Sequence, residues 1–134
     1  MLRLIDCFPL CITEVILASN PMTFFCFDKL TQAVKSQSYL QNLLSLNLSN
    51  TKIQDKNAIE LFEVVAVYSC IEDLDLSRNP HLSFKFSSHC INQLRGFQMK
   101  VSLKRLDLSY CGVSQMHQTQ IKDLLKMSEI FWKT

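Results

Sequence analysis

Short stretches in which apolar and polar residues alternate recur four times along the chain. Three of them align without gaps as residues 43–51 (LLSLNLSNT), 71–79 (IEDLDLSRN) and 103–111 (LKRLDLSYC), and residues 12–20 (ITEVILASN) form a weaker copy. A period of two is typical of a strand with one buried and one exposed face. We therefore predict four strands, whose buried pairs are Val15/Leu17, Leu46/Leu48, Leu74/Leu76 and Leu106/Leu108.

Between these stretches the apolar spacing becomes that of a helix. Three stripes repeat every three to four residues, as expected for a half-buried helix; they are Phe27/Leu30/Ala33/Val34, Ile59/Phe62/Val65/Ala66 and Ile121/Leu124/Leu125. A further short helix is indicated by Cys90, Ile91 and Leu94, and Gly96 would end it. Asp55 and Ser114 precede two of the stripes, and we expect them to cap those helices.

The strand and helix signals repeat as one unit. The last leucines of the four stretches, Leu17, Leu48, Leu76 and Leu108, are 31, 28 and 32 residues apart. The form LxxLxLSx, followed by Asn, Thr or Cys, resembles the leucine-rich repeat family of the long, ribonuclease-inhibitor-like kind, over about residues 2 to 132. The resemblance implies an α/β solenoid of about four repeats, a horseshoe segment with parallel strands on its concave face and helices on its convex face.

The position that follows each strand is held by Asn20, Thr51, Asn79 and Cys111. In the family that the chain resembles, an asparagine here bonds the turn backbone of neighbouring repeats and forms a ladder. Thr and Cys are weaker hydrogen-bonding substitutes. A further buried apolar residue is expected just after this position, at Met22, Ile53, Leu82 and Val113. One repeat cannot bury its own leucines, so stacking must create the core.

Composition agrees with one packed domain over residues 1–134. Apolar residues make up 48% of the chain and charged residues 19%, which excludes a disordered chain. Only 2 glycines are present, too few for an all-β sandwich with its many tight turns. The net charge of +2 is too small to imply a nucleic-acid or membrane partner. No apolar run reaches the length of a membrane span.

Compartment is read from the N-terminus and the cysteines. Residues 1–26 vaguely suggest a signal peptide, but Asp6 and Glu14 interrupt the apolar run. Six cysteines could form three disulfides in a secreted chain, or remain free thiols in a cytoplasmic or nuclear one. The weak signal peptide favours the intracellular interpretation, and the extracellular, disulfide-bonded one stays open.

Candidate functional residues lie on the expected concave face. Alternation places two rows of side chains there, Glu14–Ser45–Asp73–Arg105 and Ile16–Asn47–Asp75–Asp107. Arg78 and Tyr110 follow their strands at the rim and belong to residue types that are enriched in binding hot spots. Asp75 and Asp107 would be neighbouring like charges. They either indicate a cationic partner or are solvated residues of the repeat pattern, and both interpretations stay open.

Other chemistry is poorly supported by the sequence. Arg95, Lys100, Lys104 and Arg105, interleaved with Phe97 and Met99, could bind a phosphate or RNA, but a solvated loop is favoured. Neither the Cys7/Cys11 pair nor His81, His89 and His117 has metal-ligand spacing. Cys111, His117 and Asp107 form a nominal catalytic set, in which Cys111 already has a repeat role. We therefore expect no metal, no cofactor and no enzyme activity.

The leading functional hypothesis is a protein–protein interaction module with a scaffold or adaptor role. Its expected partner is a protein with a basic surface, and no nucleic acid or membrane is expected. One alternative is a regulator of a partner enzyme, of the GTPase-activating or inhibitor type, through Arg78 or Arg105. Another is an extracellular recognition domain.

The ends of the chain suggest an incomplete solenoid. Leu2, Leu4, Ile5 and Phe8 resemble the tail of a convex helix, and the spacing predicts the start of another strand near Ile130. Phe131 and Trp132 could form a lid over the last repeat. Because an open end leaves a strand edge unpaired, we expect either a fragment of a longer array or edge-to-edge self-association.

Overall fold

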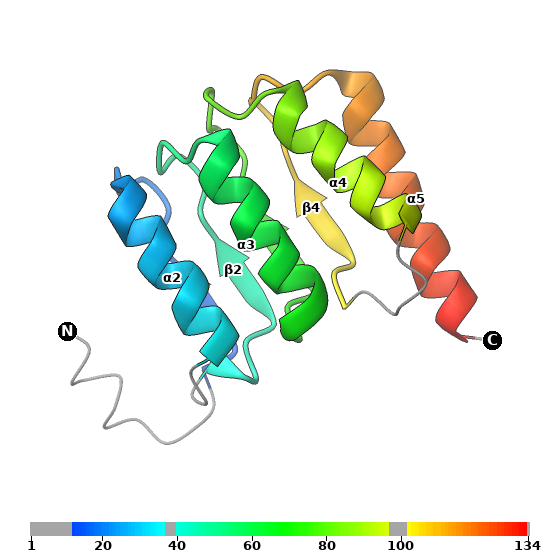
Figure 1. Ribbon diagram of the computed structural model, residues 1–134, viewed down its shortest axis with the longest axis horizontal. Coiled ribbons are helices and arrows are strands. Elements are labelled where there is room, and N and C mark those ends of the chain that lie inside the picture. Colours follow the sequence, from blue (N-terminus) through cyan, green and yellow to red (C-terminus); the bar gives the residue numbers. More distant parts are fainter. Residues whose placement is uncertain (1–11, 37–39, 97–101, 134) are drawn as a thin grey trace.

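The computed structural model of the chain describes residues 12–36, 40–96 and 102–133 (Figure 1). Strands and helices alternate throughout. Their order is β1 (Glu14–Ile16), α2 (Phe24–Ser36), β2 (Ser45–Asn47), α3 (Asp55–Tyr68), β3 (Asp73–Asp75), α4 (Phe84–Gly96), β4 (Arg105–Asp107) and α5 (Gln115–Lys133). Each strand and the helix that follows it form one repeat unit, numbered here from one to four.

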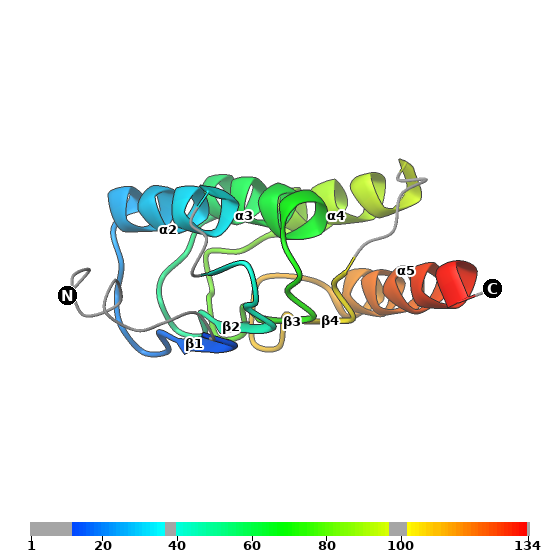
Figure 2. The same ribbon diagram turned by 90° about the horizontal axis from the view of Figure 1, so that it is seen from below.

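The four strands form one parallel sheet in the order β1-β2-β3-β4. Consecutive helices α2, α3 and α4 pack side by side on one face of this sheet, and α5 lies out of their row, closer to the level of the strands (Figure 2). The α/β architecture of four strand–helix units is therefore confirmed. Among the described residues, no helix combines the length and the apolar character that crossing a bilayer requires.

The core lies between the sheet and the helices and is deepest in the middle units. Leu46 and Leu48 of the second unit, and Leu74 and Leu76 of the third, are fully buried. The predicted helical stripes face them, and the rings of Phe62 and Phe86 meet edge to face at a centroid distance of 6.2 Å. The strand phase predicted from the alternation is thus confirmed.

Asn79 ties the second unit to the third. Its Oδ1 accepts hydrogen bonds from the backbone N–H of Thr51 (2.9 Å) and of Ile53 (3.4 Å). Its Nδ2 lies 3.0 Å from the carbonyl of Leu48 and 2.9 Å from that of Leu76. The expected ladder contact is therefore present where the repeat carries a buried asparagine.

At the equivalent positions of the other units, the residues that replace asparagine make fewer hydrogen bonds. The Thr51 hydroxyl donates to Leu48 O (2.8 Å), and the Cys111 thiol donates to Leu76 O at 3.1 Å. Asn20, in the first unit, is exposed and bonds only the carbonyls of its own turn, Leu17 and Ala18.

Of the two predicted helix caps, the one at α5 is present and the one at α3 is not. Ser114 caps α5 as expected, because its hydroxyl accepts from His117 N–H (3.2 Å). The Asp55 cap is wrong: α3 begins at Asp55 itself, and the residue before it, Gln54, makes no side-chain cap bond. Asp55 instead reaches the next unit, where its Oδ1 accepts from Ser83 N–H (2.8 Å) and its Oδ2 from the Ser83 hydroxyl (2.5 Å).

The last helix also differs, because α5 continues to Lys133 and no strand begins near Ile130. Gly at a C-cap or a following Pro commonly ends a helix, and neither residue occurs after Val113. The sequence of α5 therefore contains no such signal to end the helix before Ile130. The expectations for Leu2, Leu4, Ile5, Phe8, Cys7 and Cys11 lie outside the described residues, as do those for Phe97, Met99, Lys100 and the side chains of Phe131 and Trp132.

Candidate functional site

The face of the sheet that points away from the helices carries both predicted rows of side chains. Pairing in register aligns Glu14 with Ser45, Ser45 with Asp73, and Asp73 with Arg105. The second row runs in the same way through Ile16, Asn47, Asp75 and Asp107. All eight side chains are partly or fully exposed, so this face, called the open face below, is accessible to a partner.

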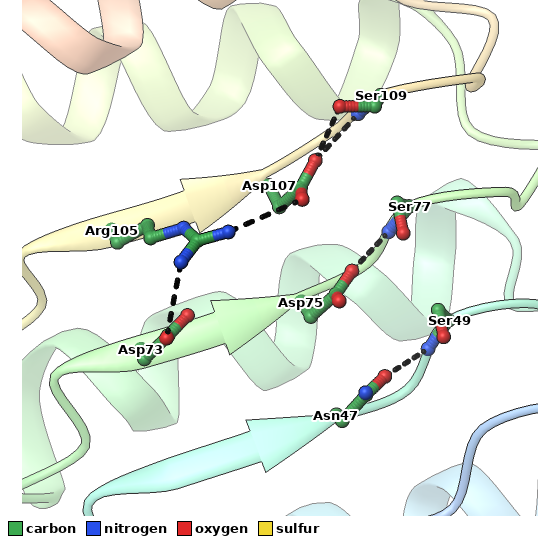
Figure 3. A network of polar contacts seen from close by, with 8 residues as sticks. All are labelled: Asn47, Ser49, Asp73, Asp75, Ser77, Arg105, Asp107 and Ser109. Atoms are coloured by element: carbon green, nitrogen blue, oxygen red, sulfur yellow. Dashed lines mark hydrogen bonds and ion pairs between the residues drawn. The ribbon is translucent and has the colours of Figure 1, made fainter.

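The second row has a structural role at the ends of the strands (Figure 3). The side-chain Oδ1 of Asn47 accepts a hydrogen bond from Ser49 N–H (3.0 Å), and Asp75 Oδ1 accepts one from Ser77 N–H (2.9 Å). Such bonds to the backbone two residues on define an Asx turn. Each of these side chains therefore holds the chain as it leaves the strand, and an amide does so as well as a carboxylate.

Asp107 repeats this contact in the fourth unit and adds to it. Its Oδ1 accepts from both the backbone N–H (2.9 Å) and the hydroxyl (2.6 Å) of Ser109. Partial burial alone would raise the pKa of Asp107, but the Ser109 hydrogen bonds and the Arg105 guanidinium outweigh burial and lower that pKa below its ordinary value. Asp107 thus stays ionised on the open face at neutral pH.

Arg105 lies between two carboxylates of the open face (Figure 3). One guanidinium nitrogen is 3.7 Å from Asp73 Oδ2, and the other is 3.7 Å from Asp107 Oδ2. The Arg105 side chain is two-thirds exposed, so solvent screens these ion pairs and their contribution to stability is small. Their effect is to hold the guanidinium at a defined place between the two strands.

Charge is unevenly distributed along the open face. The units formed by β1 and β2 contribute one carboxylate, that of Glu14, and the polar side chains of Ser45 and Asn47. Strands β3 and β4 contribute three carboxylates and one guanidinium. Beside them, Lys104 Nζ pairs with Glu72 Oε2 at 3.0 Å. Most of the charge of the open face therefore lies on its β3–β4 half, with an excess of negative charge.

The rim beside this charged half is formed by Arg78 and Tyr110. The Arg78 guanidinium carbon lies 5.0 Å from the centre of the Tyr110 ring, a cation–π contact between adjacent units. Both side chains are exposed, and Tyr110 retains 77% of its accessible surface. A stacked Arg–Tyr pair next to a group of carboxylates offers a partner both an aromatic surface and hydrogen-bond donors.

The backbone at the rim has a conformation that sequence reasoning missed. Ser19, Asn50, Arg78 and Tyr110 occupy the same position in the four units, and all have positive φ, between 52° and 63°. Only Asn among them favours this conformation, so the residue types at this position carry little signal for it. Inter-unit bonds compensate the strain: Ser19 N–H donates to Ser49 O (2.9 Å), Asn50 N–H to Ser77 O (3.0 Å) and Arg78 N–H to Ser109 O (2.8 Å).

Nominal catalytic and metal residues are not brought together. Half-burial raises the pKa of the Cys111 thiol, which opposes activation. His117 is engaged elsewhere, with Nδ1 2.7 Å from the Ser87 hydroxyl. His89 Nε2 lies 3.1 Å from Glu63 Oε1, and within the described part of the chain no three His, Cys, Asp or Glu side chains are grouped as metal ligands would be. His81 lies just before the start of α4, where it lines a pocket with residues from the start of α3.

The basic stretch predicted near residue 100 is divided by ion pairs in its described part. Lys104 and Arg105 face carboxylates of the preceding unit, while Arg95 lies exposed in the last turn of α4. In its described residues, the stretch therefore presents two ion-paired side chains and one exposed arginine.

Comparison with known proteins identifies the repeat. Residues 39–62 match the family model described as "Leucine Rich repeat". No curated protein shows significant sequence similarity to this chain. Among solved structures, the chain is similar to the C-terminal domain of tropomodulin from Caenorhabditis elegans, with 14% sequence identity, coverage of 96% of this chain and 89% of that one, and a TM-score of 0.42.

Leucine-rich repeats generally serve as protein-interaction modules. The matched segment, β2 with the start of α3, is the unit whose strand, turn and helix are repeated in register by the other three. The chain therefore has an α/β repeat fold of four units that resembles a leucine-rich repeat array, as its alternating pattern indicated.

Proposed function

We propose that this chain is a non-enzymatic protein-interaction module, with a scaffold or adaptor role, whose open face binds a basic surface of a partner protein. The observation that carries the proposal is the group of Asp73, Asp75 and Asp107 on two adjacent strands, with only Arg105 to offset them. Two negative charges remain in excess there. Neighbouring strands are about 4.8 Å apart, so these charges act on a partner together.

Charge complementarity of this kind mainly affects how fast and how selectively a partner associates. The Arg78–Tyr110 pair supports the proposal by adding contact area at the border of the carboxylates. The β1–β2 part of the open face, with Ser45, Asn47 and the exposed Ile16 beside the single carboxylate of Glu14, would supply hydrogen bonds and one apolar contact. The intervals between units favour the long, ribonuclease-inhibitor-like type of repeat.

The decisive experiment separates the charge of the open face from its structural role. Asp75→Asn/Asp107→Asn removes both charges and keeps an Oδ1 acceptor for each turn, because Asn47 already serves in that way. We expect this variant to remain folded and to lose affinity for partners captured by the wild-type chain. Loss of two partly exposed charge contacts predicts roughly three- to thirtyfold weaker binding at low salt.

The matched control is Asp123→Asn, which removes an exposed carboxylate from α5, away from the open face. Binding should also fall with ionic strength for the wild-type chain, and more weakly for the double variant. If the double variant binds every captured partner as tightly as the wild type does, the open face is not the interaction site.

The alternative of an enzyme regulator requires a free arginine. Arg105 is held between Asp73 and Asp107, and Arg78 is stacked on Tyr110, which favours the interaction role over donation of a guanidinium to a partner's active site. A GTPase assay with Arg78→Ala and Arg105→Ala tests this point. A stimulation by the wild-type chain that either variant abolishes would support the regulator instead.

An intracellular location is part of the proposal. Its support is that Cys26, Cys70, Cys90 and Cys111 are all free thiols. Secreted domains of this size often rely on disulfides. Mass spectrometry of protein purified without reductant tests it, and any disulfide found would favour the extracellular alternative.

We also propose that the chain forms a single domain with a tendency to self-associate edge to edge. Within the described residues, β1 and β4 each pair with one neighbour only, which leaves two strand edges open. Sedimentation at several concentrations tests this, and a monomer at all of them would refute it.

A further inference from the structure

A row of exposed apolar side chains follows the ends of the helices at which they begin. The first two residues of each helix are Phe24 and Phe25 in α2, Asp55 and Lys56 in α3, Phe84 and Lys85 in α4, and Gln115 and Met116 in α5. We call these eight residues the helix-start edge. In Figure 1 the first turns of all four helices lie along the same upper margin of the molecule.

Four of the eight residues are large, apolar and exposed without a structural reason. Phe24 keeps 51% of its accessible surface, Phe25 65%, Phe84 64% and Met116 66%. None belongs to the buried stripes that join the helices to the sheet. Side chains on a helix tilt toward its N-terminus, so in the first turn they project beyond the helix end. Single exposed apolar residues are ordinary, but their recurrence within the first two residues of three of the four helices indicates an interaction site.

Cations accompany these apolar side chains. Lys56 Nζ lies 5.0 Å from the centre of the Phe24 ring, and Lys29 Nζ lies 5.1 Å from that of Phe25. Lys85 directly follows Phe84. The N-terminus of each helix adds a positive partial charge on the same side. The helix-start edge therefore combines apolar and positively charged groups.

The acidic groups nearby do not cancel this charge. Asp55 is the one acid among the eight residues of the edge, and both of its carboxylate oxygens accept hydrogen bonds from Ser83. Asp28 and Glu60 lie in the second turn of their helices, as does Lys29. Among the eight residues of the edge, two lysines oppose one aspartate, so one positive charge is in excess there.

An open pocket of about 540 Å³ lies between the starts of α3 and α4. Lys56, Lys85 and His81 line it, together with Asp55, Glu60, Gln54 and one apolar residue, Ile59. A groove for an amphipathic peptide has the opposite arrangement, with an apolar floor and a polar border. Here the polar groups are recessed and the apolar side chains project outward.

Projecting apolar side chains with lysines between them fit the surface of an anionic lipid bilayer. We propose that the helix-start edge binds peripherally to membranes that contain anionic phospholipid. The phenylalanines and Met116 enter the boundary between headgroups and acyl chains, while Lys56 and Lys85 contact lipid phosphates at the mouth of the pocket. The sequence analysis found no apolar run long enough to span a bilayer and expected no membrane partner. Binding at the surface of a membrane does not require such a run.

The helix-start edge is formed by different residues from those of the proposed protein-binding face. The carboxylates Asp73, Asp75 and Asp107 lie on the open face of the sheet, whereas the helix-start edge lies at the margin where the helices begin (Figures 1 and 2). The two surfaces use different side chains, so substitutions can test the two roles separately.

Co-sedimentation of the 134-residue chain with vesicles tests the proposal. The probes are vesicles of phosphatidylcholine containing phosphatidylserine, and vesicles of phosphatidylcholine alone. We expect binding to the first that weakens as salt is raised, and little binding to the second. Lys56→Gln/Lys85→Gln should weaken binding by about fivefold per lysine, since each basic residue near an anionic surface contributes about 1 kcal/mol. Phe24→Ser/Phe25→Ser should weaken it by at least about tenfold.

Matched controls remove the same groups elsewhere. Lys122→Gln/Lys126→Gln removes two exposed lysines from the later turns of α5, and Ile16→Ser removes an exposed apolar side chain from the open face. Both should bind vesicles like the wild type, as should Asp75→Asn/Asp107→Asn, which tests the protein-binding role instead. Circular dichroism melts establish that each variant is folded.

Three results would overturn the proposal. One is the absence of binding to the phosphatidylserine vesicles. Another is equal loss in the α5 control and in the Lys56/Lys85 variant, which would indicate unspecific attraction. The third is binding of soluble poly-glutamate at the helix-start edge without vesicle binding, which would assign the edge to an acidic protein.

Discussion

The middle of the array and its first unit follow the same sequence pattern but differ in burial. Leu46, Leu48, Leu74 and Leu76, in the second and third units, are completely buried. Their counterparts in the first unit, Val15 and Leu17, are only partly buried although they occupy the same strand positions. A leucine of this pattern is therefore buried by the units on both sides of it, and not by its own unit.

The same difference appears in hydrogen bonding. Asn79 is fully buried and bonds backbone groups of two units, whereas Asn20 is exposed and bonds only its own turn. Identical side chains at equivalent positions thus have different roles. The contribution of a repeat position to stability therefore depends on whether its unit lies in the middle or at the end of the array. Equivalent substitutions in different units should lower the free energy of unfolding by different amounts.

The largest effect is expected for Leu76→Ala. This side chain is fully buried between the strands of adjacent units, so its truncation should cost about 2–5 kcal/mol of unfolding free energy through lost burial and a cavity. Leu17→Ala, at the equivalent position of the first unit, should cost about half as much or less, because it is already partly exposed. Urea unfolding of both variants measures the difference. Equal losses would mean that the first unit is as well covered as the third.

A neighbouring substitution checks the strand phase. Asp75→Ala changes the residue next to Leu76 but removes only the acceptor for Ser77 N–H, a cost of about 1 kcal/mol. The Asx turn makes the expected loss small but measurable, and a loss as large as that of Leu76→Ala would shift the phase by one residue.

Asn79→Ala should have the next largest effect. It leaves the buried Thr51 N–H without its acceptor and removes one donor each from the carbonyls of Leu48 and Leu76, which keep the bonds from the Thr51 hydroxyl and the Cys111 thiol, for a cost of about 2–4 kcal/mol. Asn20→Ala should cost less than about 1 kcal/mol, because water replaces its bonds. Thermal unfolding of the pair measures this. Similar destabilisation by both substitutions would contradict the graded ladder.

Much of the fold could be predicted because leucines at every second residue indicate directly which side chains of each strand are buried. With the phase fixed, both rows of the open face followed, and the register of Asp73 with Arg105 and of Asp75 with Asp107 is as expected. Helix boundaries were harder. Asp55 was expected to cap α3 because an acid before an apolar stripe is typical of a cap, but its bond to Ser83 depends on the neighbouring unit. A sequence pattern within one unit cannot express that contact.

The candidate site was predicted in position but not in chemistry. The like charges of Asp75 and Asp107 were expected to repel, whereas Asp107 pairs with Arg105 and each aspartate also holds a serine of its own turn. The repeated Asn-x-Ser and Asp-x-Ser spacing was a usable signal for these turns. No comparable signal existed for the positive φ of Arg78 and Tyr110, since neither residue type favours it.

A smaller effect is expected in the pH dependence of stability. The lowered pKa of Asp107 means that its contribution is present above the ordinary carboxyl value of about 4 and is lost as pH falls through the lower folded value. Asp107→Asn keeps an acceptor but has no such titration, so its stability should fall less steeply below about pH 4. Ser109→Ala, which removes one of the two Ser109 donors, should lie in between. Urea midpoints measured across this range test the order, and parallel curves for all three proteins would refute it.

The smallest perturbation that separates the first unit from the third is alkylation of single thiols. Cys26, in the first turn of α2, is exposed, and the hydroxyl of Thr23 donates to its sulfur (3.3 Å), which lowers the pKa of the thiol. Cys90 in α4 is completely buried, and burial raises the pKa of that thiol well above its ordinary value. Because the thiolate is the reactive form, Cys26 should react with iodoacetamide at least about 100-fold faster than Cys90 in the folded protein.

In urea the two rates should converge, and Thr23→Ala should slow only Cys26. Mass spectrometry of peptides at successive times gives the rates. Fast labelling of Cys90 in the native protein would mean that the third unit opens as readily as the first, and that the burial difference between them has no counterpart in stability.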